Sequence, residues 1–370
     1  MNIDRLNIIN FRNYQKETII LGKGMNIFLG ENGSGKTNIL ESISVLALTK
    51  SHRVGDSPNL IRFGTTKTKI MGKIKDNKII KNLEVEIGIG YKNLKKNKTE
   101  IKKISDYISN LNVIVFAPDD LEIIKGSPNI RRNLLNVELS QISKTYLNTY
   151  NEYNKILKTR NEYLKILFTS GLADKQYLHI ITDKLIEKAV IIYTMRNDFI
   201  NKVNEHIDKI YDHIANSEGL KMIYENNIGI NHYDEEELRK KLKHLFFKNE
   251  KREIMNGMTL YGPHRDDFTF FLHDKDLKYF GSQGQQKLTI LSLKLSLIPI
   301  FKELTNSYPV LLLDDIFSEL DIKKRNKLLK YINKDIQSII TTTDLKNINK
   351  RYLDNCNIYS VNKGKVERIE

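Results

Sequence analysis

The feature that most constrains the fold is an eight-residue run near the N-terminus. It reads Gly30-Glu31-Asn32-Gly33-Ser34-Gly35-Lys36-Thr37 and matches the pattern G-x-x-x-x-G-K-[ST]. A strand-like run, 25–29, precedes it, and apolar residues at helical spacing follow it through residue 48. A strand, a glycine-rich loop and a helix in this order surround phosphates with backbone N–H groups and the positive end of a helix dipole. The sequence therefore predicts an α/β fold that binds a nucleotide phosphate at residues 30–37.

Each residue of this loop has an expected role. Residues 30–35 supply backbone donors to the phosphates, so we expect all six to bind the cofactor: Gly30, Glu31, Asn32, Gly33, Ser34 and Gly35. Lys36 is expected to reach the β- and γ-phosphates, and the Thr37 hydroxyl is expected to ligate Mg²⁺. The predicted cofactors are ATP and Mg²⁺.

A second element of the site is an apolar strand, 310–313, that ends in Asp314 and Asp315. Asp314 would hold Mg²⁺ through water, and Asp315 stands where a water-activating base is needed. Two acids after a strand can also cap the next helix. About 280 residues separate these acids from Lys36, whereas small P-loop kinases and GTPases are more compact, and a guanine-reading Asn-Lys-x-Asp run is missing. The spacing indicates a split ATPase.

A third element lies between these two. Phe280-Gly281-Ser282-Gln283-Gly284-Gln285-Gln286-Lys287 precedes a run with apolar residues along one helical face. A serine hydroxyl, the N–H groups around Gln283 and Gly284, and a helix N-terminus all suit a γ-phosphate. A Gly/Gln-rich loop can also be an ordinary helix cap, and this alternative stays open.

The middle of the chain carries helical periodicity. Apolar residues recur at three- and four-residue spacing over 135–167 and again over 181–214, with a break at Thr169-Ser170-Gly171. Two long helices joined by a short turn pack antiparallel. We expect a helical hairpin inserted between the two parts of the nucleotide site.

Further motifs follow one another from about residue 3 to residue 344. They are Asn10-Phe11-Arg12-Asn13-Tyr14, Ser51-His52-Arg53, Phe116-Ala117-Pro118-Asp119-Asp120-Leu121, Gly126-Ser127-Pro128 with Arg131-Arg132, Gly262-Pro263-His264-Arg265-Asp266-Asp267, and Ile316-Phe317-Ser318-Glu319-Leu320-Asp321. With the three elements above, they resemble the RecF family of ABC/SMC-type ATPases. In that resemblance 282–284 is the signature loop and 316–321 is the D-loop.

The resemblance implies an ABC/SMC-type P-loop ATPase head with an inserted, mainly α-helical lobe. Residues 1–130 would form its N-terminal half with a β-rich lobe, 131–250 the helical insert, and 251–370 its C-terminal half. It implies catalytic roles for Lys36, Ser282 and Asp315, with Ser282 acting on the nucleotide of a second head in an ATP-dependent homodimer. It also implies slow DNA-stimulated hydrolysis, binding to gapped or single-strand–double-strand junction DNA without sequence specificity, and work with RecR and RecO that promotes RecA loading and the SOS response.

The chain departs from the wider ABC pattern in three places. Asp315 stands where a glutamate is usual, which leaves the identity of the base open. Thr341-Thr342-Thr343-Asp344 replaces the usual histidine, with Thr343 a candidate for a weak γ-phosphate contact. A glutamine loop is missing, and residues 116–120 are its nearest counterpart.

Charge favours a polyanionic partner. The net charge is +15 with a pI near 9.4, and neutralising phosphates releases counterions. A composition rich in Lys, Asn and Ile, as A- and T-rich codons produce, is the alternative explanation. Candidate DNA contacts are Arg131, Arg132 and a lysine run that could equally be a solvated loop: Lys92, Lys95, Lys96, Lys98, Lys102 and Lys103.

Other features exclude several classes of protein. No apolar run reaches about 18 residues, the first residues carry charge rather than a signal peptide, and Cys356 is the single cysteine. We therefore expect a cytoplasmic protein without a membrane partner, and the resemblance to the RecF family implies that it is nucleoid-associated. The chain also lacks a sequence feature expected of each of three other classes, which are a transporter ATPase subunit, an SMC-type linker and an ATPase-coupled nuclease. The remaining alternative is an ABC-type ATPase that acts on a partner other than DNA.

Overall fold

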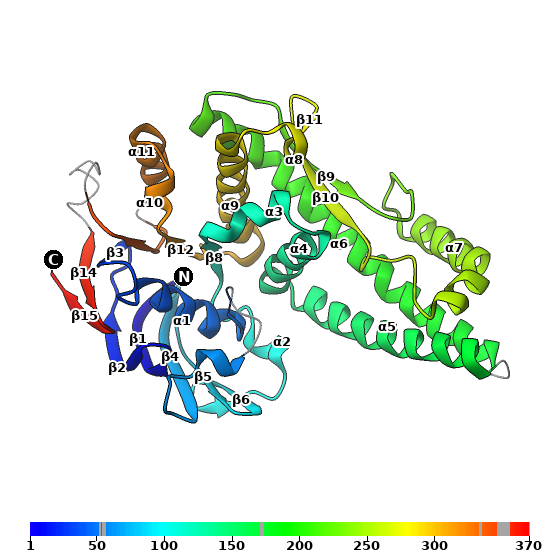
Figure 1. The fold of residues 1–370 in the computed structure, drawn as a ribbon, viewed down its shortest axis with the longest axis horizontal. Helices are drawn as coiled ribbons and strands as arrows, with labels where there is room; N and C mark the ends of the chain where they lie inside the picture. Colours follow the sequence, from blue (N-terminus) through cyan, green and yellow to red (C-terminus); the bar gives the residue numbers. More distant parts are fainter. Residues whose placement is uncertain (52, 54–56, 171–173, 333–334, 346–355, 370) are drawn as a thin grey trace. The chain divides into compact units, whose positions relative to one another are not determined.

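The computed structural model describes residues 1–370 except 52, 54–56, 171–173, 333–334, 346–355 and 370 (Figure 1). His52 and Gly171, which belong to patterns identified above, lie outside the described residues. The chain divides into two compact units. Unit 1 comprises Met1–Leu121, Ile207–Glu218 and Lys287–Glu370, and unit 2 comprises Glu122–His206 and Gly219–Gln286. The sequence-based division at residues 130 and 250 stays a prediction.

A mostly parallel sheet carries the nucleotide motifs of unit 1. Its order is β15-β14-β3-β13-β12-β8, with only the β14–β15 hairpin antiparallel. The strands are β3 (Met25–Leu29), β8 (Val113–Phe116), β12 (Val310–Asp314), β13 (Ser338–Thr342), β14 (Asn357–Asn362) and β15 (Lys365–Arg368). Every residue of β12 and β13 is buried, because helices and loops cover both faces of a parallel sheet. The strands predicted at 25–29 and 310–313 are confirmed.

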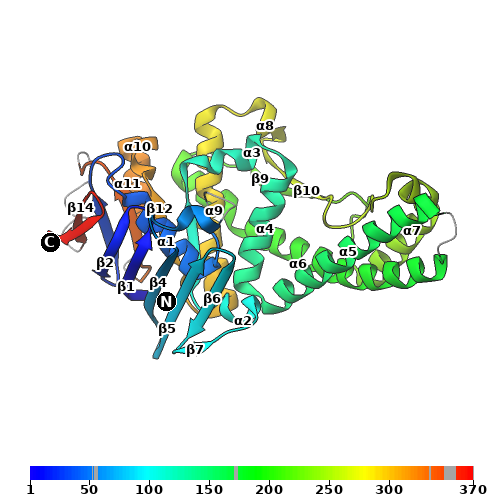
Figure 2. The same cartoon turned by 60° about the horizontal axis from the view of Figure 1, so that its bottom comes forward.

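A second, antiparallel sheet in unit 1 has the order β2-β1-β4-β5-β6-β7. Its strands are β1 (Asn2–Phe11), β2 (Tyr14–Ile20), β4 (Lys67–Asp76), β5 (Ile79–Gly88), β6 (Tyr91–Lys96) and β7 (Thr99–Glu100). Helix α1 (Lys36–Leu48), predicted for these residues, packs on one face (Figure 2). The approach is close at Gly72, where a Cβ would lie 2.4 Å from the Leu46 side chain. This contact fixes the helix that follows the phosphate loop.

Short helices complete unit 1 around these sheets. They are η1 (Ser57–Leu60), α2 (Ile104–Tyr107), η2 (Pro118–Leu121), α10 (Ile316–Glu319) and α11 (Ile322–Tyr331). Helix α9 (Gln283–Thr305) starts in unit 2 and continues into unit 1. It begins directly after Ser282, as the sequence predicts.

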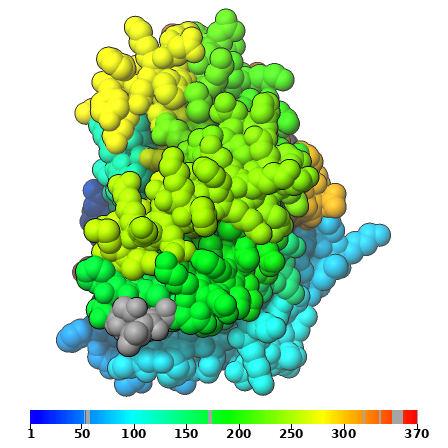
Figure 3. All heavy atoms as spheres, turned by 90° about the vertical axis from the view of Figure 1, so that its right-hand side faces the viewer, coloured from blue at the N-terminus to red at the C-terminus, as the bar shows by residue number. Residues whose placement is uncertain are grey.

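Unit 2 combines helices with a three-stranded sheet of order β11-β10-β9. Its elements are α3 (Glu122–Lys125), α4 (Pro128–Ile142), α5 (Lys144–Ser170), α6 (Lys175–Ala215, ending in unit 1), β9 (Leu220–Glu225), α7 (Glu235–Asn256), β10 (Asp267–Leu272), β11 (Lys275–Asp276) and α8 (Leu277–Phe280). Figure 3 looks onto the side chains of α5 and α7.

The predicted helical hairpin is formed by α5 and α6. Arg160 Nε donates to Thr182 Oγ1 over 2.9 Å, and Glu152 pairs with Lys188 at 2.6 Å. Partner numbers rise along α6 as they fall along α5, so the helices are antiparallel. The structure differs at Ser143, which ends α4 and whose Oγ accepts the N–H of Tyr146 to start α5. The apolar periodicity continues across this break and concealed it in the sequence.

Candidate nucleotide site

The phosphate loop keeps an open shape because of its glycines. Gly33 and Gly35 have φ of 81° and 116°, in the region that side chains rarely adopt. At Gly30 a Cβ would lie 2.4 Å from the Val361 carbonyl oxygen of β14. Glycine at position 30 therefore lets the loop lie directly against the neighbouring strand.

Two turns support the loop from outside. From the β1–β2 turn, Tyr14 OH donates to the Gly35 carbonyl over 3.0 Å and Asn13 Nδ2 donates to the Ser34 carbonyl over 3.1 Å. The Gly364 N–H of the β14–β15 turn donates to the same Ser34 oxygen over 3.2 Å. Burial raises the pKa of Tyr14, which keeps its hydroxyl a neutral donor. The Asn-Tyr of the first motif thus holds the loop that it precedes.

Lys36 lies buried on its own loop. Its Nζ donates to the carbonyls of Gly30 and Glu31 over 2.6 and 2.9 Å. Burial lowers the pKa of Lys36, and the nearby Asp315 and Asp314 carboxylates oppose that shift. The ammonium group is held at the loop by neutral acceptors, which a phosphate can replace with a charged partner.

The structure brings Thr37 and Asp314 together. Thr37 Oγ1 donates to Asp314 Oδ1 over 2.9 Å, although the residues are far apart in the chain. Thr341 Oγ1 donates to the same oxygen over 2.7 Å. Sequence reasoning missed Thr341 and chose Thr343, whose side chain is exposed. The signal that could have found it is the parallel register of β12 and β13, which pairs Asp314 with Thr341.

These oxygens fit a magnesium ion. Mg²⁺ is usually held by one or two carboxylates together with phosphates and water. Thr37 and Asp314 supply one hydroxyl and one carboxylate at hydrogen-bonding distance. Within the described residues there is no group of three His, Cys, Asp or Glu side chains that could hold a metal by itself. The Thr37 hydroxyl and the Asp314 carboxylate suit an ion that a nucleotide also coordinates.

Asp315 adopts a left-handed backbone conformation, with φ 47° and ψ 26°. Such a conformation in a non-glycine residue costs roughly 1–2 kcal/mol and persists only with support from its surroundings. Its N–H donates to Thr341 Oγ1 over 3.0 Å. The turn begins directly after the strand and places the two acids on consecutive but differently oriented residues.

Ser282, in unit 2, is the N-cap of α9. Its Oγ accepts the Gln285 N–H over 3.2 Å, while Gln285 Oε1 accepts the Ser282 N–H over 2.9 Å. This reciprocal pair is a capping box. Ser282, Gln283 and Gly284 are exposed. The helix-cap interpretation is therefore geometrically correct, and a hydroxyl that accepts one bond keeps its hydrogen to donate.

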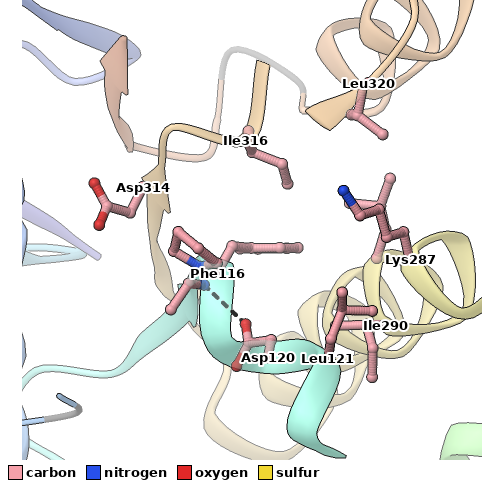
Figure 4. A pocket seen from close by; sticks show the side chains of 11 residues that line it. Phe116, Asp120, Leu121, Lys287, Ile290, Asp314, Ile316 and Leu320 are labelled. Carbon is pink, nitrogen blue, oxygen red and sulfur yellow. Dashed lines mark hydrogen bonds between the residues drawn. The ribbon is translucent and has the colours of Figure 1, made fainter. Parts of the chain in front are cut away.

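The segment 116–121 lies beside Asp314 in a pocket that α9 also lines (Figure 4). Asp120 Oδ2 accepts the Ala117 N–H over 2.8 Å, and its Oδ1 lies 3.5 Å from Nζ of the buried Lys294 on α9. Asp119 instead lines an open cavity with residues of the motif at 10–14, of α1 and of the segment after α1: Arg12, Asn13, Asn38 and Arg53. Asp119 thus lies on the side of the phosphate loop, and Asp120 lies against α9. Both acids belong to the segment that was considered the nearest counterpart of a glutamine loop.

Arg131 and Arg132 are used inside unit 2. Arg131 donates from Nε and Nη2 to the two oxygens of Asp267 over 2.6 and 2.7 Å, and its side chain is buried. Arg132 Nη1 donates to the Asp266 carbonyl over 2.6 Å. The two motifs that contain these residues therefore stabilise each other within unit 2.

The lysine run predicted as a DNA contact does not form one surface. Its lysines lie on β6, in the turn between β6 and β7, where Asn97 and Lys98 both have positive φ, and in the segment after β7. Lys92 Nζ donates to the Thr49 carbonyl over 2.5 Å, and burial lowers the pKa of Lys92. Lys95 lies on the opposite face of the sheet, 3.7 Å from Glu84. Strand alternation separates residues that are adjacent in the sequence.

A model of the RecF/RecN/SMC N-terminal domain matches residues 2–367. The DNA replication and repair protein RecF of Pediococcus pentosaceus is 38% identical over 98% of each chain. The chain belongs to the RecF family. The corresponding RecF of Halalkalibacterium halodurans is 39% identical to this RecF-family chain over the full length of both.

Solved structures agree with this assignment. A structure of the recombination mediator protein RecF with ATP, described as part of the RecFOR pathway, has a TM-score of 0.92 and 31% identity, covering 100% of this chain and 97% of that one. An SMC head bound to the C-terminal winged-helix domain of ScpA has a TM-score of 0.57 at 16% identity, covers 100% and 97% of the two chains, and shows likeness of fold only. The predicted ABC/SMC-type α/β fold is confirmed. Within the described part of the chain, no helix is long and apolar enough to span a membrane.

Proposed function

We propose that this RecF-family chain is a cytoplasmic, nucleoid-associated ATPase of DNA repair and recombination that uses MgATP as a switch. The observation that carries the proposal is the meeting of Thr37 with Asp314 beside the loop that holds Lys36. Relatives named as DNA replication and repair proteins, and RecF structures described with ATP and in the RecFOR pathway, support it.

The residues of this chain divide the work among themselves. Backbone N–H groups of residues 30–35 and the Lys36 ammonium bind phosphates. Thr37 and Asp314 hold Mg²⁺, which when bound neutralises charge on the phosphates. Asp315 orients or deprotonates the attacking water, a role usually taken by a longer glutamate, so hydrolysis is slow.

The switch works through a homodimer. In two closed heads, Ser282 of one chain donates its hydroxyl to the γ-phosphate held by the other, with the Gln283 and Gly284 backbone beside it. Exposure of all three residues supports this arrangement. Since only the ATP-bound state offers that acceptor, ATP favours closure and hydrolysis reverses it.

Duplex regions of gapped or junction DNA bind to a basic sheet surface. One face of the antiparallel sheet packs on α1, and its other face, here called the outer face, carries an excess of cations. Pairing registers place on it Arg5, Lys16, Lys67, Lys69, Lys73, Lys75 and Lys95, against Asp4, Glu84, Glu86 and Glu100. Contacts of this type neutralise phosphates without reading bases. RecR with RecO, and functionally RecA, are the proposed partners in RecA loading and the SOS response.

The deciding experiment is ATP turnover by the purified protein, alone and with gapped duplex DNA, beside an Asp315→Asn variant. We expect DNA to raise a slow basal rate, and the variant to accumulate ATP-bound dimers on DNA. If turnover ignores DNA and neither protein binds it in ATP at moderate salt, the repair role is wrong. An ABC-type ATPase with a partner other than DNA would then remain.

A further inference from the structure

One threonine hydroxyl joins both acids of the nucleotide site. Thr341 is the penultimate residue of β13 and is fully buried beside β12. Its Oγ1 donates to Asp314 Oδ1 over 2.7 Å and accepts the N–H of Asp315 over 3.0 Å. A single side chain thus bonds the expected metal ligand and the backbone of the expected base.

The bond to Asp314 restricts the carboxylate. Oδ1 accepts hydrogen bonds from two hydroxyls, Thr37 on α1 and Thr341 on β13. Two donors from different elements fix the plane of the carboxylate. Without Thr341, rotation about the side chain would be opposed only by Thr37, which is itself an expected metal ligand.

The bond to Asp315 supports a strained turn. Asp315 has φ of 47°, and its N–H donates a hydrogen bond to Thr341 Oγ1. A hydrogen bond at this position compensates part of the cost of the left-handed conformation. The direction in which the Asp315 side chain leaves the strand therefore depends on the same hydroxyl.

We propose that Thr341 is a positioning residue for the metal and for the attacking water, acting through Asp314 and Asp315. The inference rests on the proposed MgATP binding and adds to it the residue that orients the acids. The role requires a group that donates and accepts at once, which serine can do and valine cannot. Valine has nearly the volume of threonine and a high strand propensity, so Thr341→Val removes the hydroxyl with little change in packing.

The chain offers a matched control one residue away. Thr342 is also buried at the end of β13, and its Oγ1 donates to the Asp344 carbonyl over 3.0 Å rather than to either acid. Thr342→Val therefore removes a hydroxyl hydrogen bond from the same strand end without touching the site. Thr341→Ser keeps the required hydroxyl in a smaller side chain.

The test is binding of a fluorescent ATP analogue, with and without Mg²⁺, to the full-length protein and the three variants. Groups that orient metal ligands typically change metal affinity by about 10–100-fold when removed. We expect Thr341→Val to bind the analogue without Mg²⁺ within about twofold of the original protein, and to need at least about tenfold more Mg²⁺ for the metal-dependent gain. Thr341→Ser and Thr342→Val should keep that gain.

The outcomes separate this inference from the proposed function. A normal Mg²⁺ response in Thr341→Val, or equal losses in Thr341→Val and Thr342→Val, would overturn the positioning role while leaving nucleotide binding intact. Failure of the unaltered protein to bind the analogue would instead contradict the proposed function. If Thr341→Val does not fold, as thermal unfolding would reveal, Thr341→Cys against Thr341→Ser decides in its place, because a thiol is a weak donor and acceptor of similar size.

Discussion

At the scale of single residues, Arg12 stabilises α1, the helix that follows the phosphate loop. Its Nε and Nη2 donate to both oxygens of Glu41, a fully buried carboxylate on α1, over 2.9 and 2.8 Å. Arg12→Met would leave that charge without its main partner, and removing one member of a buried pair costs about 3–5 kcal/mol. Urea unfolding should show this loss, and the double variant Arg12→Met, Glu41→Leu should recover much of it. A loss below about 1 kcal/mol would contradict the argument.

A second prediction at this scale concerns His264 and the dependence of folding stability on pH. Burial lowers the pKa of His264 to about 4, and its two ring nitrogens lie 2.6 Å from Tyr153 OH and 3.2 Å from the Thr259 carbonyl. The folded value lies below the unfolded value near 6.5, so the unfolded chain binds the extra proton and stability falls as pH drops through 6.5 toward 4. Burial raises the pKa of Asp266 to about 6, so the folded chain also takes up a proton there, which opposes part of the His264 effect already near pH 6.

Urea midpoints at pH 7.5 and 6 measure the effect. We expect the unaltered protein to lose up to about 1 kcal/mol from His264 over this range. His264→Gln should lack that loss, although it is less stable at both values. Parallel pH dependence in the two proteins would show that His264 is already charged in the folded state.

The residues of the nucleotide site were predictable to different degrees. Lys36, Thr37 and Asp314 could be identified because phosphate and Mg²⁺ chemistry restricts which residue types can follow one another. Thr341 could not, because three consecutive threonines share one composition and only the register of β13 on β12 selects among them. Ser282 was predicted as a phosphate contact, which stays a prediction, while its capping bond to Gln285 was left as an alternative that the structure now shows.

At the scale of elements, Asp120 and Lys294 link the β8–α3 segment to α9. Lys294 is buried with Asp120 as its ion-pair partner at 3.5 Å. Asp120→Asn leaves a buried ammonium without its counter-charge, whereas Lys294→Met leaves a less buried carboxylate and fills the same space. We expect Asp120→Asn to lower the thermal midpoint more, and the double variant to lie above Asp120→Asn. Additive losses would mean that the pair does not interact.

DNA binding by the outer face of the antiparallel sheet is tested by the salt dependence of the affinity for DNA. Lys67, Lys73 and Lys95 are 57%, 41% and 41% exposed there. Changing all three to Gln should weaken binding to gapped duplex DNA and reduce the slope of log K against log salt by about 0.9 for each lost phosphate contact. The control changes Lys158, Lys175 and Lys240 of unit 2, which removes equal charge from helices. Equal effects in both triples would refute this surface.

Elements were predictable where the pattern was local. The helix at residues 36–48 and the buried strands follow from periodicity and apolar runs. The outer face could not be predicted from such patterns, because its lysines come from β2, β4 and β6 and meet only through strand pairing. The run around Lys92 was misleading for the same reason, since alternate residues of a strand point to opposite faces.

At the scale of the whole molecule, the parallel sheet joins distant parts of the chain. Strand β3 lies between β13 and β14, so both of its neighbours come from beyond residue 337. A fragment of residues 1–121 contains the complete phosphate loop but leaves both edges of β3 without partners. We expect this fragment to show no cooperative thermal unfolding by circular dichroism and no binding of an ATP analogue. Analogue binding at the affinity of the full chain would contradict this expectation.

The division into units was beyond a reading of the sequence. Unit 1 is assembled from three segments and unit 2 from two, and α6 and α9 run from one unit into the other. Composition changes along a chain reveal contiguous regions, whereas these units are defined by contacts between segments hundreds of residues apart. The order of the motifs was nevertheless sufficient to recognise the family.

The position of β3 also determines when the parallel sheet can form during synthesis of the chain. A ribosome adds about 5–20 residues per second, so the roughly 310 residues between β3 and β13 require about 15–60 s of translation. Throughout that interval the phosphate loop has emerged while its sheet cannot close. We therefore expect the nascent chain to bind no ATP before β13 and β14 have been made, and a chain released early to be inactive.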